Sequence, residues 1–245
     1  MNRSFVSGVA SKARRSPWLS KLTMFAAVAA AASVGTAWAG SGAPHAKRSA
    51  EETHRQLLPV LSASARPFGY SLDDMARLVA PFNISDRSGP PPNSPFQILY
   101  LNNVTQATSF DMAAGKMLYV PMIYNDDGPP IIGHFPSNAQ DRPSMLRYWY
   151  SQSELGVTTM ELVVDGKRVP LGAGYVSGVS FTPPLADGAS QYLTAGAFIA
   201  PLARGAHTVG IRFKATGDAL RIPPFDQWFT DGVWEFSIVY TVNVQ

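Results

Sequence analysis

Histidine is rare in this 245-residue chain, and each of its four positions is a candidate base or metal ligand. His207 lies between two glycines in the stretch "PLARGAHTVGIRFKATG". From there His207, Val209, Ile211 and Phe213 alternate with a more polar set, the period-two pattern of a strand with one face on the core. We therefore predict that His207 begins the inward row of a strand. Because buried polar groups are normally paired, we expect it to hydrogen-bond a loop carbonyl.

The other histidines are separated from His207 and from one another. His45 lies in a small polar leader and His54 in a predicted helix, where both are expected to be solvated, while His134 stands alone in a loop. Zinc and iron sites need several closely placed ligands, and the chain has neither a His-Glu-x-x-His motif nor a phosphate-binding glycine loop. The sequence therefore argues against a zinc or iron enzyme.

The most suggestive acidic stretch is "YNDDGPP", in which Asn125, Asp126 and Asp127 directly follow a predicted strand. Calcium takes six to eight oxygen ligands, and such residues at a sandwich edge are one source of them, with Asp141 in the next loop as a further contributor. The alternative is a polar turn, since Asn, Asp and Gly dominate turns by bonding their own backbone. Calcium is the one cofactor that the sequence suggests.

Two aromatic clusters are candidates for ligand binding. "RYWY" contains Trp149 and Tyr150, and "PFDQWF" contains Asp226 and Trp228. Exposed aromatic rings stack on the apolar faces of sugars, and nearby polar groups fix the ligand's orientation. The competing interpretation is that these rings fill the core, as large aromatics usually do. Adjacent rings of one helix cannot all face the core, so we expect one ring of "RYWY" to reach the surface.

Catalytic signatures are otherwise missing. The chain has no cysteine, and "GYVSGVS" around Ser177 lacks the G-x-S-x-G spacing of a serine hydrolase. A glycosidase needs two acids roughly 5–10 Å apart. Glu161 and Asp165 flank one predicted strand, but the rise per residue separates them by about 13 Å. A polysaccharide hydrolase with carboxylates from several strands remains an alternative.

Residues 1–39 read as a secretory signal peptide. The first 23 residues hold five basic and no acidic residues, and the apolar run "MFAAVAAAASVGTAWAG" ends in an Ala-x-Ala site with cleavage expected after Ala39. A membrane anchor is the rival interpretation, but the run is short and alanine-rich for a bilayer span. We therefore expect a periplasmic or extracellular protein without a membrane span after cleavage.

Removal of that segment changes the charge balance. The chain holds 20 Lys+Arg and 17 Asp+Glu, so loss of the five basic residues leaves 15 against 17, a net charge of −2. Nucleic acid and anionic membranes require a clustered positive surface, which such a chain lacks. Without cysteine there is no disulfide, and the fold must rest on its core.

Residues 40–95 are predicted to form a leader with two short helices and a proline-rich connector. Ser49 and Glu52 have the spacing of a capping box for the first helix. The second, "SLDDMARLVAP", has Ser71 as its N-cap and Pro81 as its stop. The connector "SDRSGPPPNSP" suits neither helix nor central strand.

A β-domain is predicted from 96 to 245. Short segments rich in β-branched and aromatic residues alternate with turn residues, most clearly in the terminal "WEFSIVYTVNV". Asp165-Gly166 suits a two-residue hairpin turn. One helix is expected in "DRPSMLRYWYSQSELG", with Asp141 as cap, Pro143 in the first turn and Gly156 as stop.

Several phrases resemble known domains. "PLARGAHTVGIRFKATGDA" resembles the L-x-x-G-x-H-T strand segment of bacterial immunoglobulin-like sandwich domains, and "MELVVDGKRVPL" resembles their V-D-G-K hairpin. With "AGKMLYVPMIY" and "YTVNV", the pattern is also similar to exported bacterial proteins of unassigned function. The resemblance implies a fold and transfers no active-site residue.

These observations predict a mainly β protein: a β-sandwich of immunoglobulin-like or jelly-roll type preceded by two short helices. The predicted role is non-enzymatic binding of an extracytoplasmic carbohydrate or protein by loops at one end of the sandwich. Besides the hydrolase, a structural subunit of a surface assembly, pairing through exposed strand edges, is the other alternative.

Overall fold

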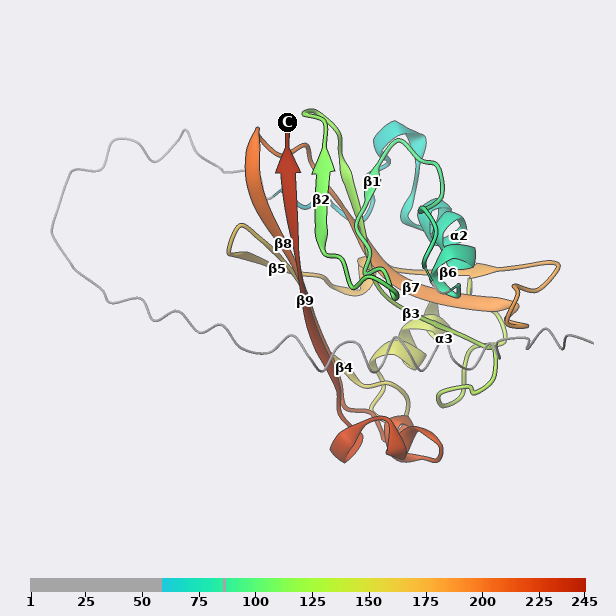
Figure 1. The fold of residues 1–245 in the computed structure, drawn as a ribbon. Helices are drawn as coiled ribbons and strands as arrows, with labels where there is room; N and C mark the ends of the chain where they lie inside the picture. Colours follow the sequence, from blue (N-terminus) through green and yellow to red (C-terminus); the bar gives the residue numbers. More distant parts are fainter. Residues whose placement is uncertain (1–58, 86) are drawn as a thin grey trace, which may run out of the picture.

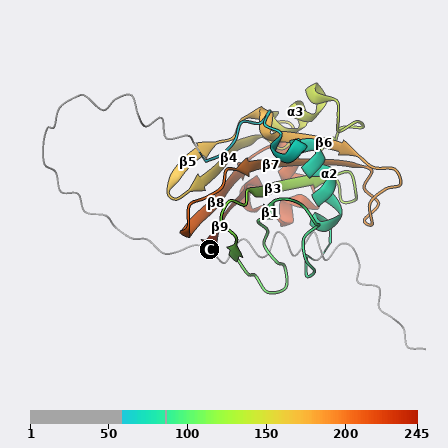
Figure 2. The same cartoon turned by 90° about the horizontal axis from the view of Figure 1, so that it is seen from above.

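The computed structural model describes residues 59–85 and 87–245. The predicted signal peptide, His45, His54 and the helix expected around Ser49 to Glu52 lie outside the described residues. Within them, two β-sheets pack face to face, as Figures 1 and 2 show from two directions. The prediction of a mainly β, two-sheet sandwich is confirmed.

The two sheets differ in size. The four-stranded sheet has the order β1 (Gln97–Ile98), β3 (Leu118–Asp126), β7 (Gln191–Ile199), β6 (Val176–Ser180). The five-stranded sheet has the order β2 (Ser109–Met112), β9 (Trp234–Val244), β8 (Gly205–Ala215), β4 (Val157–Val164), β5 (Lys167–Pro170). Both sheets are mixed, because β1 pairs with β3 and β2 pairs with β9 in parallel.

The two helices are α2 (Leu72–Asn83) and α3 (Arg142–Tyr150). Five 3₁₀ turns complete the elements, three of them between β8 and β9 at the end of the sandwich drawn in red in Figure 1: η1 (Pro67–Gly69), η2 (Ala173–Tyr175), η3 (Asp218–Arg221), η4 (Phe225–Gln227) and η5 (Thr230–Gly232). None of the helices in this described part is long and apolar enough to cross a membrane.

Helix α2 begins as its sequence predicts. Ser71 accepts a hydrogen bond from the Asp74 N–H, and the Asp74 carboxylate accepts one from the Ser71 N–H, which completes a capping box. The predicted stop at Pro81 is wrong, because the helix runs on to Asn83 and the Ile84 N–H still donates to Ala80 O. A proline in the last turn loses one hydrogen bond without ending the helix.

The apolar side of α2 covers the outer face of the four-stranded sheet. Ala76 and Ala80 pack against Tyr124, Val179 and Tyr192, and α2 lies across β6 and β7 in Figure 2. Small residues at these positions let the helix approach the sheet closely. The four-stranded sheet is therefore buried on both faces, and residues 59–85 pack against the sandwich.

Helix α3 connects β3 to β4. The Asp141 carboxylate accepts a hydrogen bond from the Ser144 N–H, and Pro143 lies in the first turn, as predicted. The helix ends at Tyr150 rather than continuing toward the predicted stop at Gly156. Gly156 has φ +58°, so it serves a later turn of the chain.

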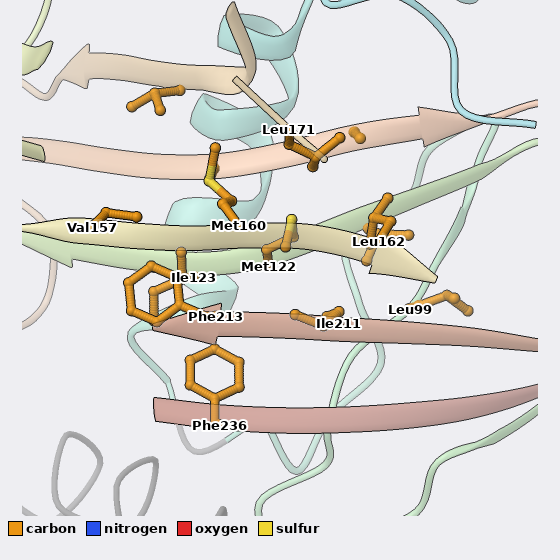
Figure 3. Packing of buried hydrophobic residues seen from close by; sticks show 14 of the residues in the cluster. Leu99, Met122, Ile123, Val157, Met160, Leu162, Leu171, Ile211, Phe213 and Phe236 are labelled. Carbon is orange, nitrogen blue, oxygen red and sulfur yellow. The ribbon is translucent and has the colours of Figure 1, made fainter. Parts of the chain in front are cut away.

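The core lies between the sheets. It takes side chains from β3, β4, β8 and β9, and the labelled members in Figure 3 are Leu99, Met122, Ile123, Val157, Met160, Leu162, Leu171, Ile211, Phe213 and Phe236. On β9 the residues from Trp234 to Val244 alternate between buried and more exposed, which confirms the period-two pattern of the sequence.

Candidate binding site

His207 occupies the place that the strand pattern predicts. Its Nε2 lies 2.9 Å from Ala203 O, so the expected loop carbonyl is present. Its Nδ1 lies 2.7 Å from Oδ2 of Asp165, at the tip of the β4–β5 hairpin. Asp165 and Gly166 both have positive φ, as the predicted two-residue turn requires. The ring therefore links two strand ends, and this arrangement is structural.

The Asp165–His207 pair predicts a pH-dependent stability. The hydrogen bond with Asp165 raises the pKa of His207 above its usual 6.5, against an opposing effect of burial. Burial raises the pKa of Asp165, but hydrogen bonds from His207 and the Thr208 N–H outweigh it and hold the pKa below 3.8. Both ring nitrogens face acceptors, and only the protonated imidazole can donate to both. The histidine contribution is therefore complete below about pH 6.5 and is lost as the pH rises through the raised pKa.

We expect urea unfolding experiments to show the pH-dependent contribution of the Asp165–His207 pair. The His207→Gln substitution should destabilise the protein more at pH 5.5 than at pH 8.5, by less than about 1 kcal/mol because the Asp165 carboxylate is half exposed. His134→Gln is the exposed counterpart: His134 also pairs with a carboxylate, Glu154 at 3.1 Å, but its side chain is 92% exposed, so its loss should have less effect at both pH values. An equal loss at both pH values for His207→Gln would contradict the assignment.

The three residues of the suggested calcium site point in different directions. Asn125 donates to the Tyr148 hydroxyl at 3.2 Å, while Asp126 Oδ1 accepts from the Gly128 N–H at 3.0 Å. Asp127 accepts from the backbone N–H groups of Ser190 and Gln191, at 2.6 and 2.8 Å, and from the Ser190 hydroxyl. Asp127 thereby fastens one loop to the start of β7, the kind of role that its turn-like sequence allows.

A neighbour that the sequence did not indicate is Asp187. A Cβ atom added at Gly128 would meet Asp126 Oδ1 at 3.0 Å and Asp187 Oδ2 at 3.1 Å, so the two carboxylates flank this glycine. Asp141, the fourth suggested ligand, caps α3 instead. Across residues 59–85 and 87–245, no group of three or more His, Cys, Asp or Glu side chains is placed to hold one metal ion.

The aromatic candidates also divide. Trp149 is fully buried in the core beside Tyr148, whereas Tyr150 is 36% exposed and is the ring of "RYWY" that reaches the surface. Trp228 is half-buried, with its ring edge-on to Phe225 at 5.3 Å, and Asp226 is exposed. The structure thus leaves Tyr150, Trp228 and Asp226 accessible from outside.

A different set of residues forms a pocket at one side of the sandwich. The pocket has a volume of about 30 Å³ and opens to solvent on one side. Its walls come from four segments: Pro121, Met122 and Ile123 of β3; Trp234, Phe236, Ile238 and Tyr240 of β9; Tyr100, Leu101 and Asn103; and Arg87. We call this the mouth pocket; Figure 3 shows Met122, Ile123 and Phe236 in the adjoining core.

The sheet topology explains why the sandwich opens here. Strand β1 pairs only with Leu118 and Tyr119 of β3, and β2 pairs only with residues 241–244 of β9. Beyond those positions, β3 and β9 have no strand neighbour on that side within the described residues. The segment between β1 and β2 must cross from one sheet to the other, and its Tyr100 closes part of the gap. The mouth pocket is what remains open.

Aromatic rings build the wall beside this crossing segment. Tyr100 is edge-on to Phe82 at 5.0 Å and to Phe110 at 5.6 Å, and Phe110 is edge-on to Tyr240 at 5.8 Å. Such edge-to-face pairs have favourable geometry beyond their buried area. The chain of rings holds the wall in place from α2 to β9, so the pocket is preformed.

Arg87 is the unusual member of the pocket. It is only 8% exposed, and its Cζ lies 5.7 Å from the centre of the Tyr124 ring. Its Nε has no hydrogen-bond partner among the described residues. Burial raises the pKa of Tyr240, and the nearby Arg87 charge partly offsets this. A buried N–H donor without a hydrogen-bond partner is costly, which distinguishes Arg87 from the other residues that line the pocket.

The Arg87 backbone carries a second sign of constraint. Its φ is +52°, in the left-handed region that non-glycine residues rarely adopt. Strained backbone persists where the surroundings fix it, and such residues gather at ligand-binding sites. Nothing local in "SDRSGPPP" signals this role, because the pocket forms only when four distant segments meet.

The fold is a two-sheet β-sandwich with a small pocket between its sheets. Comparison with protein-family models, with curated proteins and with solved structures finds no significant match to this chain.

Proposed function

We propose that this chain is an exported, non-enzymatic binding protein that holds a small, largely apolar ligand in the mouth pocket. The observation that carries the proposal is the pocket itself, a preformed opening lined by aromatic and aliphatic side chains with a few polar groups. That composition, mostly apolar with a few polar groups, is typical of small-molecule sites. The signal-like residues 1–39 support export, and the immunoglobulin-like phrases are in keeping with a binding module.

A carbohydrate or protein ligand, which the sequence favours, has a second candidate surface. Trp228 is held by Phe225 and lies beside the exposed Asp226, an arrangement that offers part of a ring together with a hydrogen-bonding group. The hydrolase alternative has less support, because Glu161 pairs with Arg212 at 3.1 Å and Asp165 pairs with His207. Glu161 and Asp165 are therefore each already paired with a basic side chain.

Neighbouring residues of β9 provide the test. Ile238 lines the mouth pocket, whereas Val239 is 56% exposed on the opposite face of the same strand. We expect Ile238→Trp to fill the opening and weaken binding of small apolar molecules by about tenfold or more, the effect of losing roughly 1.4 kcal/mol. Val239→Trp should leave binding unchanged.

The measurement is a chemical-shift titration of the purified protein with 3-phenylpropionate, octanoate and the corresponding amides. Shifts should concentrate on β3 and β9 and include the Trp234 indole. Absence of binding by all four compounds at millimolar concentration, or equal loss in the two tryptophan variants, would overturn the proposed function.

A further inference from the structure

We infer that the mouth pocket selects a monocarboxylate with a slim apolar or aromatic body, and that Arg87 binds the carboxylate. This rests on the proposed function, which requires only that the pocket bind a small apolar molecule. The new element is the anionic group and the residue that recognises it.

The Arg87 side chain has unmet hydrogen-bonding capacity. A guanidinium has five N–H donors. The side chain is more than nine-tenths buried and lines the pocket, yet Nε is without a hydrogen-bond partner in the described part of the chain. Its Cζ lies over the face of Tyr124, a contact that does not use the in-plane Nε–H. An incoming acceptor would satisfy this donor without any other bond having to break.

The charged groups around Arg87 also affect what it can bind. Burial is the main cause that raises the pKa of Tyr124; the charge of Arg87 lowers this pKa, and the charges of Asp126 and Asp187 raise it further. Arg87 takes no part in the ion pairs formed by His134, His207, Arg212, Lys214 and Arg221. Asp126 and Asp187 contribute to the field around it, but neither accepts a hydrogen bond from its Nε.

The size and the lining of the mouth pocket determine which anion fits. The inner space is only about 30 Å³, and its other walls, apart from Asn103 at the rim, are aromatic or aliphatic. A planar carboxylate matches the guanidinium fork with two parallel hydrogen bonds. A phosphate ester brings nearly two charges and more oxygens than this single arginine can satisfy. The pocket therefore favours one carboxylate attached to a flat ring or an unbranched chain.

The test compares each acid with its neutral amide, which has nearly the same shape. In the unmodified protein we expect 3-phenylpropionate and octanoate to bind about tenfold or more tightly than their amides, as for hydrogen bonds to a charged group. Arg87→Met should remove this preference by weakening the acids alone. Arg87→Lys keeps the charge without the fork, so it should restore only part of the preference.

The matched control is Arg66→Met, which removes an exposed arginine outside the mouth pocket and should change neither affinity. Equal binding of acids and amides, with both blocked by Ile238→Trp, would overturn the carboxylate inference and leave the proposed function standing. Binding of phenyl phosphate more tightly than the acids would also overturn it. Since the first comparison uses the unmodified protein, the test holds even if an Arg87 variant fails to fold.

Discussion

Substitution of Gly178 by alanine should destabilise the sandwich severely. Gly178 lies in β6, and a Cβ atom there would overlap the backbone carbonyl of Ala139 and lie 2.9 Å from Cδ2 of Leu193. The obstacle is backbone, which cannot rotate away as a side-chain end would. We expect a loss of about 3 kcal/mol in the free energy of unfolding, the upper part of the range for overpacking. For a domain of this size the melting temperature should fall by roughly 6–12 °C.

Gly172→Ala is the matched control for this prediction. An added Cβ at Gly172 meets no atom within 4 Å, and its φ of −85° suits alanine. This variant should be neutral or slightly stabilising, because alanine restricts the unfolded chain more than glycine does. Equal melting temperatures for the two variants would contradict the close approach of residue 139 to β6.

The segment around Ala139 packs on one face of β6, because a Cβ atom at Gly178 points out of the plane of the sheet. Strand β6 is the outermost strand of its sheet, and the Ala139 N–H is anchored by Oε1 of Gln191 at 2.8 Å. Open strand edges promote association between chains. If alanine at 178 displaces the segment around Ala139, the variant should scatter more light during the melt than Gly172→Ala does.

Local patterns explain which parts of the fold the sequence predicts well. The period-two alternation of β9, the Asp165-Gly166 turn and the caps of α2 and α3 depend on residues next to one another in the chain, and all four are present. Strand β6 gives no alternation, because four of its five residues are buried. Strand β2 pairs in parallel with the C-terminal strand, about 130 residues away. The residue pattern of β2 does not indicate that partner.

The mouth pocket illustrates the limit for function. The sequence points to tryptophans and paired acids because these have recognisable chemistry. Arg87 lies in a polar, proline-rich connector whose composition predicts only a loop. Its importance comes from burial, an unused donor and a left-handed backbone, which are tertiary properties. That one ring of "RYWY" reaches the surface, in contrast, is predictable because successive residues of a helix point in different directions, although the sequence does not say which ring.

The largest side-chain effect should come from Trp149. Its ring is fully buried in the core cluster, where Tyr148 and Met145 are also buried. Truncation to alanine leaves a large cavity, so Trp149→Ala should lower the free energy of unfolding by about 3–5 kcal/mol in urea denaturation. Tyr150→Ala, one position along α3 and 36% exposed, should cost less than about 1 kcal/mol.

Trp149→Phe separates packing from hydrogen bonding at this position. The indole Nε1 is buried and has no hydrogen-bond partner within residues 59–85 and 87–245. A buried donor left unsatisfied costs about 1–3 kcal/mol, so phenylalanine removes that penalty while it forfeits part of the ring volume. We expect the two effects nearly to cancel, with Trp149→Phe within about 1 kcal/mol of the unmodified protein. A loss as large as that of alanine would mean that the indole N–H is satisfied in solution. If Trp149→Ala were instead stable but unable to bind a sugar, Trp149 would belong to the binding surface that its sequence first suggested.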